Sequence, residues 1–411
     1  MDRTLRIISG ITYWSVILLP FSVAIAPGLA NSIIGIMLFT FLIEKFLKKE
    51  KPFVMSLPVV VFFIFIFIGA LSFVNSTNLK DSLNGMIKLF KYFVIFVIYS
   101  ESVRDKSHLK RIAISAACGV SLIGIDALWQ IYTGRDFIRG NVLNGAIGLS
   151  RATASFPGCN VLGVYLTGLT PLIAGLAIFL SRKKEKLLFT VAAILGATGI
   201  YLSLSRGAGI GFFVSVVFLS LVKKNKFMVS ALILAFLIYP FIMPQNIKDW
   251  AKSLNYNPFY ILTCQTRVGI YRNTLHMINE HPFLGIGINT FSRSYNQYRL
   301  AEVETTNETA PGYYAHNNFL HMAGEMGLFG LAAFLVFLFL VFKSAWKAFK
   351  RGKDPYVKAF AVSVFAAILA YLINGLTETS LYHPRVVMIF WLMVGLSLAL
   401  GKAADQGIKE G

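Results

Sequence analysis

Three polar residues beside long apolar runs have side chains suited to anion binding and proton transfer. Arg206 lies in the sequence Ser205-Arg206-Gly207, Arg267 opens a polar stretch, and His316 directly precedes an apolar run. A guanidinium binds phosphate groups through paired hydrogen bonds, and a neutral imidazole can accept a proton. Residues of these types could hold a phosphate or pyrophosphate and activate a hydroxyl group. Each of them could also be an interfacial anchor at a membrane boundary.

His316 belongs to a pattern with regular spacing. Asn317 follows it, nine residues separate Asn317 from Gly327, and two more separate Gly327 from Gly330. At 3.6 residues per turn, Ala323, Gly327 and Gly330 lie on one stripe below His316. Small residues let a neighbouring helix approach closely, so we expect this stripe to fix the helix and its first turn. Asn317 is the expected N-cap.

The composition predicts that these residues lie on transmembrane helices. Hydrophobic residues make up 56% of the 411 residues, charged residues only 14%, and phenylalanine occurs 36 times. Since a bilayer core of about 30 Å requires roughly 20 apolar residues per helix, we expect an all-α polytopic membrane protein with about twelve transmembrane helices. The predicted spans are 7–26, 28–47, 57–75, 85–102, 112–131, 161–180, 187–204, 208–222, 227–244, 317–342, 359–376 and 386–401.

The basic residues predict the orientation of these helices. The net charge is +20, and most Lys and Arg residues cluster in alternate loops. Cytoplasmic loops carry such an excess, so both termini are expected in the cytoplasm, and the charge is not taken as evidence for nucleic acid. The segments that then face outward are 76–84, 132–160, the turn at 205–207, 245–316 and 377–385.

The longest outward segment, 245–316, is expected to be a functional loop between helices 9 and 10 of a single transmembrane domain, 1–411. A stretch within it, 266–280, has apolar residues at helical spacing and ends before Pro282. We predict an amphipathic helix there, with Thr266 as its cap, on the outer surface. The apolar face would consist of Val268, Tyr271, Leu275 and Ile278.

The predicted topology brings the three polar residues to one side of the membrane. The helices after Arg206 and His316 both start there, and helix N-termini attract anions. Together with Arg267 they predict an anion site. Lys88 and Lys91 lie inside the fourth apolar run, where charge is costly, and are secondary candidates for it. The other outward basic residues, Arg139, Arg151, Arg272 and Arg385, show that charge alone does not select a site.

No residue spacing predicts a metal site. His321 and Glu325 lie four residues apart on one helix, but without a third ligand they are expected to be packing partners. Cys118 falls within a predicted helix. Cys159 and Cys264 both lie on the outward side, where a disulfide is allowed, although we expect unpaired thiols.

These motifs resemble the O-antigen ligase (WaaL) family of the ligase/polymerase superfamily. The resemblance rests on His316-Asn317 with Gly327 and Gly330, on Ser205-Arg206-Gly207, on Thr266-Arg267 and on the sequence Pro282-Phe-Leu-Gly-Ile-Gly287. It implies a GT-C-like fold in the bacterial inner membrane, a periplasmic active site and the catalytic residues Arg206, Arg267 and His316.

The resemblance also implies the reaction. A glycan would move from undecaprenyl pyrophosphate to the lipid A-core oligosaccharide, without a metal or other cofactor and with inversion. Arg206 and Arg267 would bind the pyrophosphate, and His316 would accept the proton or orient the hydroxyl. We expect a monomer or a weak oligomer.

Two other classes of function fit the sequence. A Wzy-type polysaccharide polymerase, or a protein O-oligosaccharyltransferase, would use the same donor and the same motifs with another acceptor. A lipid-glycan flippase or transporter would also have about twelve helices, but such proteins often show two repeated halves and paired charges near the midplane. Neither feature is evident here.

Overall fold

A computed structural model describes residues 3–103, 105–146, 149–242, 245–253, 265–300 and 314–406. An α-helix covers each of the predicted apolar runs, and ten of the described helices are long and apolar enough to cross a membrane. The protein is therefore an all-α multi-pass membrane protein, as predicted. The helices are α1 (Arg3–Ile25), α2 (Pro27–Leu47), α3 (Leu57–Leu71), α4 (Leu79–Ser102), α5 (Lys106–Thr133), α6 (Cys159–Phe179), α7 (Lys183–Ser203), α8 (Arg206–Val222), α9 (Lys226–Ile242), α14 (Asn318–Arg351), α15 (Pro355–Asn374) and α16 (Val387–Gln406).

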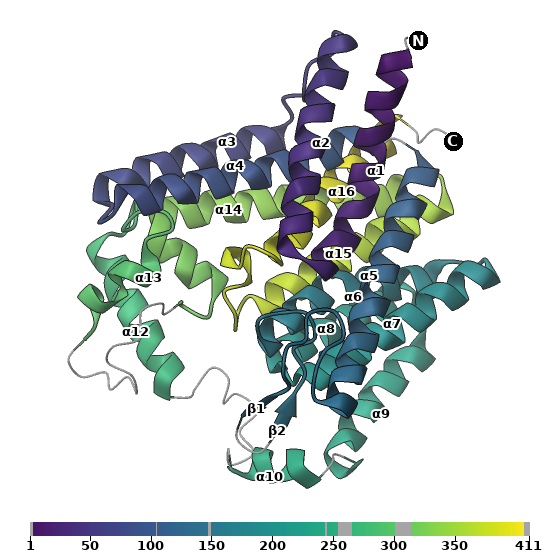
Figure 1. Cartoon of the computed structure of the whole chain (residues 1–411), viewed down its shortest axis with the longest axis vertical. Coiled ribbons are helices and arrows are strands. Elements are labelled where there is room, and N and C mark those ends of the chain that lie inside the picture. The colour runs from purple at the N-terminus through teal and green to yellow at the C-terminus, as the bar shows by residue number, and fades with distance from the viewer. Residues whose placement is uncertain are drawn as a thin grey trace.

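Shorter elements lie in two places, with α10 (Gln245–Ser253) beside the two strands at the bottom of Figure 1 and α12 (Gln265–Glu280) and α13 (Phe291–Ser294) at its left. The start of α1 and the end of α16 lie together at the end opposite the strands (Figure 1). We call the end with the strands the hairpin end, because β1 (Asn144–Ala146) pairs antiparallel with β2 (Leu149–Arg151) there. The other short elements are the 3-10 turns η1 (Ser72–Asn75), η2 (Tyr295–Tyr298) and η3 (Ser380–Tyr382).

Glycines allow α6, α8 and α15 to pack closely. A side chain at Gly175 of α6 would collide with Ser363 of α15, and one at Gly211 of α8 would collide with the backbone of Ala370. Close approach of backbones is the usual way in which helices associate in a membrane. This packing holds the end of α15 beside the start of α8, and the segment after α15 therefore begins next to Arg206.

The helix after His316 is not the continuous helix that the small-residue stripe predicts. α14 is broken at Gly327, whose φ of 66° and ψ of −175° are not helical. A side chain there would collide with the backbone of Phe283. The loop that contains Phe283 occupies the break, where Leu328 N–H donates to Pro282 O over 2.7 Å and Ile286 N–H donates to Gly324 O over 3.0 Å. Gly327 thus admits a loop, whereas the prediction assigned it to contact with another helix.

The helix α12 confirms the predicted amphipathic segment, but its buried face differs from the predicted one. Leu275 is 49% exposed, whereas Asn273 and Thr274 are fully buried. The Asn273 amide donates to Tyr295 Oη over 2.8 Å and accepts from Leu300 N–H over 3.0 Å. A polar side chain can be buried when it is satisfied in this way, which apolar periodicity alone does not reveal.

Candidate active site

Arg206 is the first residue of α8, at the hairpin end. Ser205 precedes it as the N-cap with extended backbone angles. Gly207 lies so close to Thr377 that a side chain at Gly207 would collide with the Thr377 hydroxyl. The start of α8, where free N–H groups favour anions, is therefore packed against the segment that follows α15.

Arg267 reaches the same segment from α12. Its guanidinium donates to Thr377 O and, over 3.0 Å, to Glu378 Oε1. The Arg267 and Glu378 side chains are only 14% and 13% exposed. A guanidinium held by two acceptors has a fixed orientation, because its N–H groups form a rigid fork.

His316 contacts the other oxygen of Glu378. The distance between His316 Nδ1 and Glu378 Oε2 is 3.4 Å, and the imidazole is 37% exposed. The His316 backbone has a φ of 47°, which is uncommon for a residue other than glycine. Such strain persists only where surrounding contacts impose it and is often found at functional sites.

The contacts that impose it come from the start of α14. Asn317 is the N-cap, since its side chain accepts from Phe319 N–H and Leu320 N–H over 2.9 and 3.1 Å. Asn318 N–H donates to Gly375 O over 2.7 Å, and the Asn318 amide donates to Ser380 Oγ over 2.9 Å. These bonds fix the start of α14, and with it His316, against the segment that carries Glu378.

Glu378 has a third partner on α6. Asn160 donates to Glu378 Oε1 over 2.8 Å, and Arg151 of β2 donates to Asn160 Oδ1 over 3.0 Å. Arg151 also donates to Ser203 O over 3.1 Å, at the end of α7. A chain of hydrogen bonds therefore runs from the residues just before Arg206, through Glu378, to His316.

A cavity of about 160 Å³ opens beside His316 and Glu378. It is also lined by Asn160, Tyr382 and His383. Burial lowers the pKa of His383, and the positive charge of Arg385 lowers it further, so this imidazole is neutral at neutral pH. Arg206 and Arg267 are not among the described lining residues, and Arg267 reaches the cavity only through Glu378. His316 and Glu378 put polar groups on the wall of this cavity, where a hydroxyl group could approach the imidazole.

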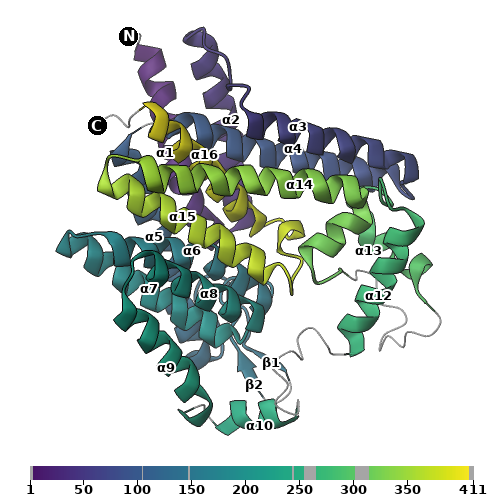
Figure 2. The ribbon, with the colours of Figure 1, turned by 180° about the vertical axis from the view of Figure 1, so that it is seen from behind.

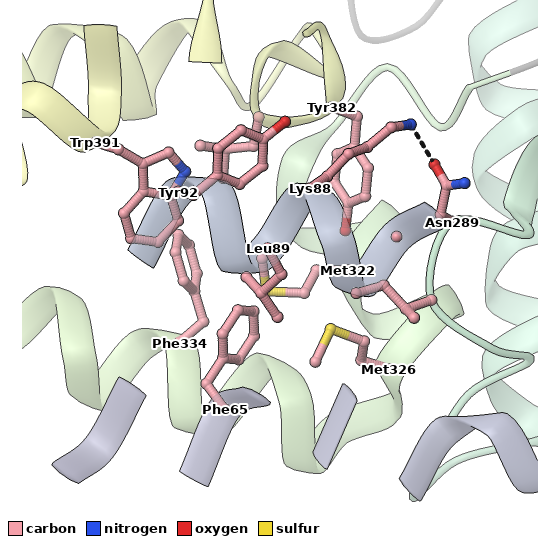
Figure 3. A pocket seen from close by; sticks show the side chains of 13 residues that line it. Phe65, Lys88, Leu89, Tyr92, Asn289, Met322, Met326, Phe334, Tyr382 and Trp391 are labelled. Carbon is pink, nitrogen blue, oxygen red and sulfur yellow. Dashed lines mark hydrogen bonds between the residues drawn. The ribbon is translucent and has the colours of Figure 1, made fainter. Parts of the chain in front are cut away.

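The structure places Lys88 in a different cavity. Its ammonium donates to Asn289 Oδ1 over 2.8 Å at the edge of a space of about 60 Å³ with largely apolar walls (Figure 3). Tyr382 lines both this space and the His316 cavity. Lys91 contacts Asn31 Oδ1 at 3.5 Å. Neither lysine is among the described residues around His316, and their role in pyrophosphate binding stays a prediction.

No group of three or more His, Cys, Asp or Glu residues suited to a metal ion occurs among the described residues. His321 and Glu325 pair at 3.3 Å and are each 1% exposed, which fits the packing role predicted for them. Cys159 is a buried free thiol, and Cys264 lies outside the described residues.

Sequence reasoning missed Glu378, Asn160 and Arg151. Glu378 lies in the predicted outward segment 377–385, but one acidic residue in a short loop gave no reason to select it. Arg151 was set aside with the other outward basic residues. The one available signal was that Glu378 is an acidic residue on the side of the membrane predicted to hold two arginines and a histidine.

Comparison with known proteins gives a family model that matches part of the chain. Residues 191–335, which contain Arg206, Arg267 and His316, match the family model described as O-Antigen ligase. This match covers part of the chain and supports its membership of the O-antigen ligase/polymerase superfamily. This superfamily consists of glycosyltransferase-like membrane enzymes that act on lipid-linked glycans, and the match does not separate ligases from polymerases.

Two further comparisons add little to this assignment. A chain of the solved structure described as "Structural coordination of polymerization and crosslinking by a peptidoglycan synthase complex" is similar, with 15% identity and a TM-score of 0.45 over 84% of this chain and 98% of that chain. A search of curated proteins gives no match. The GT-C-like architecture therefore stays a prediction.

Proposed function

We propose that this protein is an O-antigen ligase. It would move a glycan from undecaprenyl pyrophosphate to a hydroxyl of the lipid A-core oligosaccharide, on the periplasmic side of the bacterial inner membrane. The observation that carries the proposal is the convergence of Arg267 and His316 on the two oxygens of Glu378, beside the helix start that bears Arg206. These three residues come from distant parts of the chain and would form one polar site at the hairpin end.

Arg206 and Arg267 would hold the pyrophosphate of the donor. Its charge increases as the bond between the anomeric carbon and the pyrophosphate oxygen breaks, and fixed guanidiniums stabilise that charge. The N-terminus of α8 adds a partial positive charge at the same place. Two guanidiniums and a helix start could thus take the role that a metal ion has in many glycosyltransferases.

His316 would accept the proton of the acceptor hydroxyl. With Nδ1–H donating to Glu378, the Nε2 atom is the free acceptor of the ring. The hydroxyl oxygen attacks the anomeric carbon, the pyrophosphate leaves from the opposite face, and the proton moves to His316. The carboxylate of Glu378 stabilises the imidazolium that forms, and a single displacement inverts the anomeric centre.

The test is a transfer assay with the purified full chain. Labelled undecaprenyl-pyrophosphate glycan is mixed in detergent with lipid A-core acceptor, and products are separated by gel. A ligase shifts label to the lipid A-core band, whereas a polymerase lengthens the lipid-linked glycan without that acceptor. His316→Ala is expected to abolish the shift while the protein still purifies as a single species. No transfer by the wild-type chain to any hydroxyl acceptor would refute the proposal.

A further inference from the structure

A large groove lies outside the candidate active site, between α6, α7, α8 and α9. Its volume is about 970 Å³, and most of its lining is apolar. It begins beside Gly209, where a side chain would meet open space, and it extends along α8 to Lys223. The distance along the helix from Gly209 to its end corresponds to roughly 20 Å. The groove therefore runs along most of the membrane-spanning length of α8.

The helix α9 leaves this groove open to the bilayer. It runs from α8 towards α10 at the edge of the molecule (Figure 2). Phe227 and Phe241, near its two ends, are 84% and 81% exposed. In a membrane, the apolar walls of this groove would face lipid acyl chains, which are as apolar as leucine side chains.

Positive charge is confined to one end of the groove. Lys186 at the start of α7 and Lys223 at the end of α8 both line it, and none of the lining residues is acidic. The Lys223 ammonium lies 4.9 Å from the centre of the Phe179 ring, which holds it at this end. Ser181, Thr190 and Asn225 add polar groups there. This end is opposite to the hairpin end, because α8 begins at Arg206.

We propose that the groove binds an anionic glycerophospholipid. The acyl chains would lie along the apolar walls of α7, α8 and α9, and the phosphodiester would lie between Lys186 and Lys223. Basic pockets between transmembrane helices bind anionic head groups, while an uncharged or zwitterionic head group would leave the two ammonium groups without a counter-charge. Cytoplasmic loops of membrane proteins are rich in Lys and Arg, which explains why lysines occur at this end of the bundle. This does not explain why two of them line an apolar groove without a carboxylate. This inference is independent of the proposed transfer reaction.

Native mass spectrometry of the full chain in detergent tests the proposal. The protein is titrated with phosphatidylglycerol or with phosphatidylcholine of the same acyl chains. One phosphatidylglycerol should stay bound at concentrations at which phosphatidylcholine dissociates. Lys186→Gln with Lys223→Gln should weaken phosphatidylglycerol binding at least tenfold. Lys343→Gln with Lys353→Gln, two exposed lysines outside the groove, should leave it unchanged.

A variant that fills the groove distinguishes lipid binding inside the groove from attraction of the lipid to surface charge alone. Ala197→Phe keeps both lysines and should still reduce phosphatidylglycerol binding, with gel filtration showing that the variant is folded. Equal retention of the two phospholipids would overturn the proposal, since it would indicate that lipid binds without selection for its head group. Unchanged binding by the double lysine variant would also overturn it. Stronger retention of undecaprenyl phosphate than of phosphatidylglycerol would assign the groove to the donor instead.

Discussion

Two arginines near the segment 374–386 have opposite surroundings. Arg267 is partly exposed, pairs with the Glu378 carboxylate, and through it is linked to the cavity beside His316. Arg385 is 2% exposed and donates to the backbone oxygens of Val23, Ala24 and Ser155. Burial lowers the pKa of Arg385 to about 10, which leaves it charged at neutral pH.

The different partners of the two arginines indicate different roles, a structural one for Arg385 and a functional one for Arg267. The acceptors of Arg385 are carbonyl groups that cannot leave, and the Phe156 ring covers its guanidinium at 3.8 Å from the ring centre. Arg267 instead pairs with a carboxylate that a bound anion could replace as its partner. We infer that Arg385 joins α1 and the loop before α6 to the start of α16, whereas Arg267 serves the reaction.

The largest expected effect is on folding, from Arg385→Met. The variant leaves Val23 O and Ser155 O without this donor, while Ala24 O keeps its bond from the Ser155 hydroxyl, and each buried unsatisfied group costs about 1–3 kcal/mol. We expect aggregation on gel filtration, or a much lower thermal unfolding temperature in detergent. The exposed Arg135→Met serves as the control and should unfold like the wild type. If the Arg385→Met protein unfolded like the wild type, Arg385 would not be needed for folding, and the structural role assigned to it would be wrong.

Arg267→Ala should remove activity and spare the fold. Loss of a donor to a developing oxyanion typically costs about 10²–10³ in rate. Arg267→Lys should recover only part of it, because an ammonium lacks the planar fork. The measurement is the initial rate of glycan transfer, with Arg272→Ala as the matched control on the exposed face of the same helix. Near wild-type transfer by Arg267→Ala would remove this residue from the mechanism.

Glu378→Gln should slow transfer while preserving the shape of the side chain. The amide cannot stabilise a positive His316, and the loss expected for impaired general base catalysis is about 10²-fold. Glu280→Gln, at the exposed end of α12, should have no effect. If the Gln variant kept full transfer, Glu378 would be a structural partner of Arg267 and no more.

The smallest expected effect is that of Asn160→Ala. Asn160 donates to Glu378 and accepts from Arg151, and a hydrogen bond of this kind contributes about 1.5–3 kcal/mol when its partner is charged. We expect transfer to fall by roughly one order of magnitude, with Asn160→Asp worse than Asn160→Ala because a second carboxylate would repel Glu378. The same transfer assay measures both variants, and the opposite order would contradict the assigned role.

The helices, and the expectation that the three polar residues lie on one side of the membrane, could be predicted from the sequence because both follow from local patterns. Apolar runs give the spans, Asn317 has the side chain of an N-cap, and the basic loops imply that Arg206, Arg267 and His316 share one side. The position of Glu378 depends on the close packing of α8 and α15, which brings Thr377 against Gly207. No short-range pattern carries that information.

Two errors in the fold have the same origin. Gly327 was assigned to helix packing because its spacing from Gly330 fits a helical stripe, yet a distant loop occupies its position. The buried face of α12 was misplaced because Asn273 finds partners in the segment around Tyr295. In both places, contacts between remote segments override a local periodicity.

The most direct test of the account is a double-mutant cycle between Glu378 and His316. Transfer rates are measured for the wild type, Glu378→Gln, His316→Ala and the double variant, all purified as single species. Residues that act as one unit lose their function together, so the double variant should be no slower than His316→Ala alone. Losses that multiply would contradict the claim that Glu378 acts through His316.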